Sequence, residues 1–240
     1  MDSHAPEKLD RIATEYDSEK DFDFHLIRFG YARIRKRLKA GRVLEMGCAS
    51  GVMTRLLVKD AAKLEVVDGS RTYLDQLARD PALAEVVLHQ SLFEEFKPEG
   101  RFSDIVMARA LEHLEDPVGM LRKTAGWLEP GGKLHIVVPN ADSLHRRLGV
   151  AMGMLNKTDD LSERDRRFGH HRVYRRALLV EHLSAAGFRV LHSEGVFLKP
   201  LSNRQMENWD ETLLSAFDRI GNELPDWCAE IYVTAETGDF

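Results

Sequence analysis

A glycine-rich turn preceded by an acidic residue is the first feature of the sequence that is able to bind a ligand. The short apolar run 43–46 leads into the pattern Glu45-x-Gly47-x-Ala49-x-Gly51. Glycine has no Cβ and accepts positive φ, so such a turn between a strand and a helix lets a ligand approach the backbone closely. A dinucleotide-binding turn would read GxGxxG, whereas a carboxylate two positions before the first glycine suits an ammonium-bearing ligand better than a pyrophosphate.

A second acidic residue, Asp68, follows the apolar run 63–67. A carboxylate at the end of the second strand of an open α/β sheet can accept hydrogen bonds from both ribose hydroxyls of a nucleoside. Together with the glycine-rich turn, Asp68 therefore predicts a nucleoside-containing ligand. The alternative is that Asp68 is a turn residue before Gly69 and that Glu45 is a capping or ion-pairing carboxylate.

Three histidines are candidates for proton transfer. His113 follows the fourth expected strand, and His170 and His171 precede the helix expected from residue 174. An oxygen nucleophile usually loses a proton as it attacks, and histidine is suited to accept it. Adjacent residues in extended chain point opposite ways, so we expect His170 rather than His171 to face the substrate. Alternatively, His113 organises the site, and the other two cap a helix or pack under a lid.

Arginines are concentrated between residues 162 and 176. They are Arg164, Arg166, Arg167, Arg172, Arg175 and Arg176, against Glu163 and Asp165. Such a run is typical of a solvated helix face, but guanidinium groups also bind carboxylate or phosphate in a bidentate manner, which would indicate an anionic substrate. No ligand spacing such as HxxxD or HxH is present, so no metal is expected. A metal held by His113 or His170 with nearby acids stays an alternative.

Composition excludes several classes of protein. The 240 residues are 43% hydrophobic and 30% charged, as in soluble globular proteins, and the net charge of −5 disfavours a nucleic-acid-binding role. Cys48 and Cys228 lie far apart without metal-ligand spacing, which favours a reducing, cytoplasmic location. No basic and apolar leader or membrane-spanning run is recognisable, so no membrane association is expected.

Hydrophobic periodicity alternates between helix-like and strand-like segments. The expected strands are 43–46, 63–67, 84–89, 102–107, 133–138, 188–197 and 228–234. The expected helices are the first forty residues, 52–59, 71–79, 118–128, 174–186 and 202–224. This alternation predicts an α/β fold with a mostly parallel sheet covered by helices on both faces. We expect one domain over 1–240, with a helical cap over 1–40 and substrate-side lid insertions over 140–172 and 199–224.

Four motifs in order resemble those of class I S-adenosylmethionine-dependent methyltransferases, in the form seen in ubiquinone-biosynthesis-like and natural-product enzymes. They are Val43-Leu44-Glu45-Met46-Gly47-Cys48-Ala49-Ser50-Gly51, Asp68, Phe102-Ser103-Asp104-Ile105-Val106 with Ala110-Leu111-Glu112-His113-Leu114-Glu115-Asp116-Pro117, and Leu128-Glu129-Pro130-Gly131-Gly132-Lys133-Leu134. The resemblance covers about residues 20–198. It implies a Rossmann-like seven-stranded sheet of order 3-2-1-4-5-7-6, with the last strand antiparallel, and S-adenosylmethionine as cofactor.

The resemblance also implies roles for individual residues. The cofactor contacts would be Glu45, Gly47, Cys48, Ala49, Gly51, Asp68, Gly69, Gln90, Ser91 and Arg109. From their positions after the fourth expected strand and before the helix expected from residue 174, the candidate catalytic residues are His113 and His170, and the candidate acceptor contacts are His171, Arg172 and Tyr174. Two positions depart from the family pattern: Ala49 replaces a glycine, and 89–92 lacks the aspartate that often binds the adenine amino group, so Gln90, Ser91 or a backbone group would serve.

The expected function is methyl transfer to a small molecule, most readily to a hydroxyl or carboxylate oxygen of a sugar or natural-product metabolite. Methylation of an amine or amino sugar is the alternative within the fold. A protein or RNA methyltransferase is disfavoured by the acidic net charge, and a binding protein that lost the chemistry is disfavoured by the intact loop and Asp68. The sequence is compatible with a monomer or a homodimer.

Overall fold

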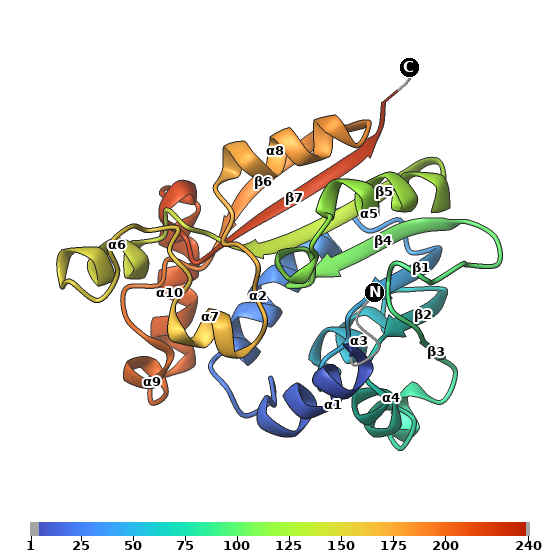
Figure 1. The fold of residues 1–240 in the computed structure, drawn as a ribbon, viewed down its shortest axis with the longest axis horizontal. Coiled ribbons are helices and arrows are strands. Elements are labelled where there is room, and N and C mark those ends of the chain that lie inside the picture. Colours follow the sequence, from blue (N-terminus) through green and yellow to red (C-terminus); the bar gives the residue numbers. More distant parts are fainter. Residues whose placement is uncertain (1–4, 239–240) are drawn as a thin grey trace.

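The computed structural model describes residues 5–238, so residues 1–4 of the expected cap and 239–240 lie outside the described residues. Seven strands form one sheet of order β3-β2-β1-β4-β5-β7-β6, which confirms the predicted order. Their bounds are β1 Arg42–Met46, β2 Lys63–Asp68, β3 Val87–Gln90, β4 Phe102–Ala108, β5 Leu128–Pro139, β6 Phe188–Val196 and β7 Glu230–Thr237. Only β7 runs antiparallel to its two neighbours, as predicted for the last strand (Figure 1).

The helices and the sheet alternate along the chain as the periodicity predicts. The α-helices are α1 Ala5–Glu15, α2 Asp23–Arg35, α3 Val52–Leu57, α4 Arg71–Leu77, α5 Pro117–Trp127, α6 Leu144–Ala151, α7 Glu163–Arg167, α8 Arg176–Ala185, α9 Asn203–Met206 and α10 Glu211–Gly221. Short 3₁₀ turns lie at Pro81–Leu83, Leu111–His113 and Pro225–Trp227. No helix within residues 5–238 is long and apolar enough to cross a bilayer.

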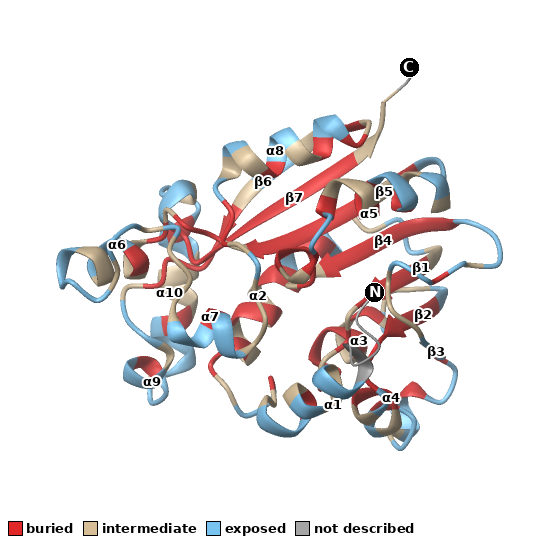
Figure 2. Ribbon diagram, in the orientation of Figure 1, coloured by how far each residue is buried: buried red, intermediate tan, exposed pale blue. Residues whose placement is uncertain are grey.

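Two hydrophobic clusters cover the two faces of the sheet. Successive strand residues point to opposite faces, so Val43 packs in one cluster with side chains of α2, α3 and α4, whereas Leu44 packs in the other with those of α5 and α8. Figure 2 shows the central strands buried and the outer sides of the helices exposed. The sheet is therefore buried on both faces, as expected for parallel strands joined by helices.

Two expected helices differ in detail from the structure. The first forty residues form two helices, α1 and α2, which are separated by a segment that contains a turn at residues 18–20. The segment 202–224 is divided into α9 and α10, because the carboxylate of Asp210 accepts the backbone N–H of Leu213 and starts a new helix. In the long segment after β5 only α6 and α7 are α-helical, and they lie beyond the carboxyl end of that strand (Figure 1).

Candidate active site

A cavity of about 1600 Å³ opens at the carboxyl ends of the parallel strands. Its wall includes the loop after β1, the ends of β2 and β4, residues of α1, and parts of both expected lid segments. Ligands of open α/β sheets bind at this edge. The fold therefore brings the candidate ligand-binding segments together around one space.

The loop after β1 turns through left-handed conformations. Gly47 has a φ of 85°, Ala49 of 44° and Gly51 of 87°. Gly47, Cys48 and Ala49 line the cavity, whereas Gly51 does not. At Gly51 a Cβ would lie 2.9 Å from Leu77 Cδ1, so that glycine permits close packing of α3 against α4.

Asp68 lies beside this loop at the end of β2 and lines the cavity. Its Oδ2 accepts the backbone N–H of Cys48 at 2.9 Å, and its Oδ1 accepts that of Ser70 at 2.8 Å. Burial raises the pKa of Asp68, although these hydrogen bonds oppose the increase. The Cys48 thiol also donates to Oδ2 at 3.4 Å, so the side chain is held in one orientation. Oδ1 keeps a further acceptor position, and a second hydroxyl would take the place of the thiol at Oδ2.

Gly69 shows how closely α1 covers this part of the cavity. A Cβ on Gly69 would lie 2.5 Å from Leu9 Cδ1. The carboxylate of Asp10 holds α1 in place by accepting the Ser70 hydroxyl at 2.6 Å and the Thr72 N–H at 3.0 Å. The first helix therefore rests directly on the end of β2.

Glu45 is buried and is absent from the cavity wall. Neither carboxylate oxygen has a hydrogen-bond partner among the described residues. Burial, with the neighbouring Asp68 carboxylate, raises the pKa of Glu45 from 4.5 to about 8. A positive charge nearby would stabilise its ionised form.

The end of β3 presents different residues from those expected. Gln90 and Ser91 do not line the cavity: Gln90 is exposed, and the Ser91 hydroxyl donates to the backbone carbonyl of Leu92 at 2.9 Å. Leu92 and Phe93 line it instead. These two apolar side chains, which Glu94 follows in the wall, suit the face of a planar ring better than a polar edge.

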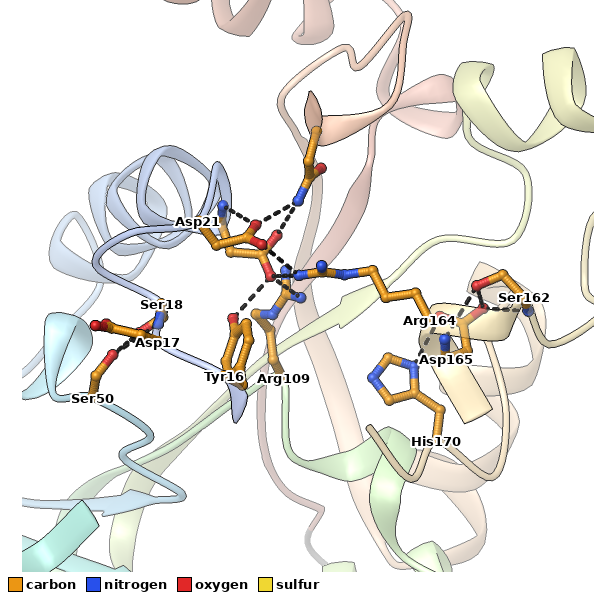
Figure 3. Close-up of polar contacts among 12 residues, drawn as sticks. Tyr16, Asp17, Ser18, Asp21, Ser50, Arg109, Ser162, Arg164, Asp165 and His170 are labelled. Atoms are coloured by element: carbon orange, nitrogen blue, oxygen red, sulfur yellow. Dashed lines mark hydrogen bonds and ion pairs between the residues drawn. The ribbon is translucent and has the colours of Figure 1, made fainter. Parts of the chain in front are cut away.

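Arg109 is the centre of a buried ion-pair group. Its guanidinium donates to Asp23 Oδ2 at 2.9 Å and to Glu230 Oε1 at 2.6 Å, and the Tyr16 hydroxyl donates to the same Asp23 oxygen at 2.8 Å. Figure 3 shows Arg109 beside Tyr16. Arg109 also has a left-handed φ of 58°, unusual for a residue with a side chain. Arg109 lines the cavity, but its guanidinium is hydrogen-bonded to protein carboxylates and is therefore not free to bind a ligand alone.

The same group joins the lid segments to the sheet. Arg164 of α7 donates to Asp21 at 3.0 Å and to Asp23 at 3.1 Å, and Asn203 of α9 donates to them at 2.6 and 3.1 Å. Removing one member of a buried ion pair typically costs about 3–5 kcal/mol, since the other charge is left unpaired. Asp23 therefore joins α7 and α9 to the end of β4.

His113 and His170 lie together in the cavity wall. Their ring centroids are 4.6 Å apart at an interplanar angle of 88°. Burial and the nearby His170 lower the pKa of His113 to about 3, so this imidazole is neutral. His170 Nδ1 lies 3.2 Å from Asp165 Oδ1, and Asp165 is itself held by Ser162 (Figure 3).

The three predicted acceptor contacts have different environments. His171 lines the cavity, but Arg172 and Tyr174 do not. Arg172 donates to backbone carbonyls of the turn after β4, including that of Glu115 at 3.2 Å, and so anchors the returning segment. Tyr174 is fully buried, with its hydroxyl 3.3 Å from His182 Nδ1.

The arginine run is mainly structural. Besides Arg164 and Arg172, the guanidinium groups of Arg167, Arg175 and Arg176 contact the side chains of Glu15, Asp142 and Asp226 respectively. Arg166 lines the cavity, and its guanidinium has no partner within residues 5–238. Of the six arginines in the run, Arg166 therefore remains as the candidate for binding an anionic substrate.

Sequence reasoning missed several residues of the cavity. Lys199 follows β6, lines the cavity and is buried, and burial lowers its pKa from 10.5 to about 8. Asp23 and Glu230 lie at opposite ends of the chain, and no motif connects them. Asp23 lies inside the helix expected over the first forty residues, and Glu230 lies inside the strand expected over 228–234, so no signal in the sequence indicates that either belongs to a site.

Comparisons with known proteins agree with this geometry. A family model described as a methyltransferase domain matches residues 18–193. Ubiquinone biosynthesis O-methyltransferase from Coxiella burnetii (strain RSA 331 / Henzerling II) is 26% identical over 186 residues, which cover 74% of this chain and 76% of that protein.

Two solved structures share the fold. The DhpI-SAM-HEP complex is 18% identical with a TM-score of 0.64, covering 98% of this chain and 100% of that chain. The N-methyltransferase NodS from Bradyrhizobium japonicum WM9, in complex with S-adenosylhomocysteine, is 16% identical with a TM-score of 0.54, covering 88% of each chain. With the matching family model and the cavity described above, the chain belongs to the class I S-adenosylmethionine-dependent methyltransferases.

Proposed function

We propose that this methyltransferase acts on an oxygen, hydroxyl or carboxylate, of a small-molecule acceptor such as a sugar or natural-product metabolite. The observation that carries the proposal is the position of His113 and His170, which line the same cavity as the glycine-rich loop and Asp68. A hydroxyl acceptor must lose a proton as it is methylated, and imidazole groups at the acceptor end can assist that loss, whereas a carboxylate acceptor arrives already ionised.

The residues around the loop fit the cofactor. We assign the ribose hydroxyls to Asp68, the close backbone approach to Gly47, Cys48 and Ala49, and the charge of the amino group to the partnerless carboxylate of Glu45. Gly69 lies in the wall beside the ribose position, and the apolar side chains at the end of β3 suit the adenine ring. When bound, S-adenosylmethionine supplies an electrophilic methyl group.

The remaining task of the protein is to align the acceptor and exclude water. The buried ion-pair group around Arg109 and Asp23 supports this role, because Asp23 holds α7 and α9 over the cavity. Arg166 and Lys199 line the acceptor side, which favours an acceptor that carries a negative charge. His171 lies in the same wall and is proposed to contact the acceptor.

An amine acceptor is the second candidate. Glu230 lines the cavity, and its Oε2 has no hydrogen-bond partner among the described residues. A carboxylate in this position would hold an ammonium group until it is deprotonated. An amine needs only to arrive neutral, so the histidines would matter less for its methylation.

The acceptor class is tested with S-adenosylmethionine carrying a labelled methyl group and acceptors that share a scaffold but differ in their hydroxyl, carboxylate or amine group. We expect the label on oxygen, and about a 100-fold lower turnover of the hydroxyl acceptor in His170→Ala. Label transferred only to nitrogen, with little effect of the substitution, would support the amine acceptor and overturn the proposal.

A further inference from the structure

Glu112, His113 and His170 bring three metal-ligand side chains together, and the two histidines line the cavity. One ligand atom of each lies within 4.8 Å of the others. Glu112 and His113 belong to the 3₁₀ turn Leu111–His113 after β4, whereas His170 follows α7. Because the ligands come from segments far apart in the chain, no short spacing motif reveals the cluster.

Glu112 has no other evident function in the fold. Its side chain is fully buried, and neither carboxylate oxygen has a hydrogen-bond partner among the described residues. A buried carboxylate without a partner is costly unless a cation compensates it. The positive charge of Arg109 acts on Glu112 from nearby, but its guanidinium is bonded to Asp23 and Glu230 and forms no hydrogen bond with Glu112.

Each histidine also has a polar neighbour outside the cluster. His170 Nδ1 lies 3.2 Å from Asp165 Oδ1 (Figure 3), and the His113 ring is hydrogen-bonded to the backbone of Gly169. Histidines that bind metals usually donate their second ring N–H to a carboxylate or a backbone carbonyl, which fixes the ring orientation. The cluster thus has supporting contacts as well as ligands.

We infer that Glu112, His113 and His170 form a binding site for a first-row divalent cation, with Zn²⁺ as the best fit. Two imidazoles and one carboxylate are a common ligand set of zinc sites that keep an open position. Ligand atoms around such an ion are about 3.4 Å apart, so modest side-chain rotations would complete the site. Both histidines line the cavity, so the open position faces the acceptor.

The function of this cation rests on the proposed O-methylation. An acceptor hydroxyl bound at the open position becomes more acidic and releases its proton to water. Its oxygen then forms the C–O bond with the methyl carbon as the C–S bond of the donor breaks. The products are the methylated acceptor, S-adenosylhomocysteine and one proton.

The site is tested by titrating metal-stripped, cofactor-free protein with Co²⁺, followed by visible absorption, and then displacing Co²⁺ with Zn²⁺. We expect one equivalent to bind with a four- or five-coordinate spectrum. Glu112→Gln should weaken Zn²⁺ binding at least about 100-fold and Asp165→Asn about 10- to 100-fold. His192→Ala, which changes an exposed histidine of β6 that does not line the cavity, should bind as the wild type does.

Two results would overturn the site: no such spectrum in the wild-type protein, or a Glu112→Gln variant with unchanged affinity and a native circular dichroism spectrum. Methyl transfer to a hydroxyl acceptor is then compared before and after metal removal. Full activity of the stripped enzyme, alongside proven Co²⁺ binding, would overturn the catalytic function of the cation. Absence of methyl transfer from the metal-loaded enzyme, with the spectrum intact, would count against O-methylation instead.

Discussion

Replacing Asp68 with alanine is expected to weaken binding of S-adenosylhomocysteine at least about 100-fold. Hydrogen bonds to a charged group contribute about 1.5–3 kcal/mol each, and two ribose hydroxyls would lose their acceptor. The change also removes the carboxylate that accepts the Cys48 and Ser70 backbone N–H groups. These hydrogen bonds orient the loop after β1. Titration calorimetry on the two proteins measures the difference.

Asp75→Ala is the matched control for this experiment. Asp75 is an aspartate on α4 that pairs with Arg71 and does not line the cavity, so its loss should leave the affinity unchanged. Thermal unfolding shows whether the Asp68 variant keeps its fold. An Asp68→Ala protein that is folded and binds within a few-fold of the wild type would contradict the assignment of the ribose to this carboxylate.

Glu45→Gln is expected to reduce the dependence of folding stability on pH. The pKa of Glu45 is about 8 in the folded protein and near 4.5 when the chain is unfolded. At a pH between these two pKa values, Glu45 is ionised in the unfolded chain but keeps its proton in the folded protein. The wild type therefore loses folding stability as the pH rises through this range. From pH 5 to pH 8 this amounts to about 3 kcal/mol. Glutamine does not titrate, so the variant should not show this loss.

Urea unfolding of the cofactor-free protein at pH 5 and pH 8 measures this effect. Other titrating groups contribute to both proteins, so the informative quantity is the difference between their pH dependences. Glu85→Gln, which changes an exposed glutamate, should behave as the wild type does. Equal slopes for the wild type and Glu45→Gln would show that the Glu45 carboxylate is ionised in the fold and has a compensating partner.

The strands and the position of the cofactor loop could be predicted from the sequence because they depend on local patterns, whereas the strand order followed from the resemblance to methyltransferases. A buried parallel strand reads as a short apolar run, and the turn after β1 needs glycine where φ is positive. The apolar run and the glycines of the turn are each recognisable within a few consecutive residues. The ends of the helices were less predictable, since the division between α9 and α10 depends on a single capping carboxylate at Asp210.

The acceptor side could not be predicted because its contacts join distant parts of the chain. Tyr174 was expected at the acceptor, but it packs in the core with His182. The arginine run indicated anion binding, yet its charges are mostly compensated by acids such as Glu15 and Asp226. Spacing alone does not show which charges become partners once the lid segments fold back onto the sheet.

The central claim is that one cavity holds the donor at the loop and Asp68 and the acceptor at His113 and His170. A crystal structure of the complex with S-adenosylhomocysteine tests it most directly. We predict that both ribose hydroxyls contact Asp68, that the adenine lies against Leu92 and Phe93, and that the sulfur faces the two histidines. S-adenosylhomocysteine bound outside this cavity, or with its sulfur directed away from His113 and His170, would contradict the account.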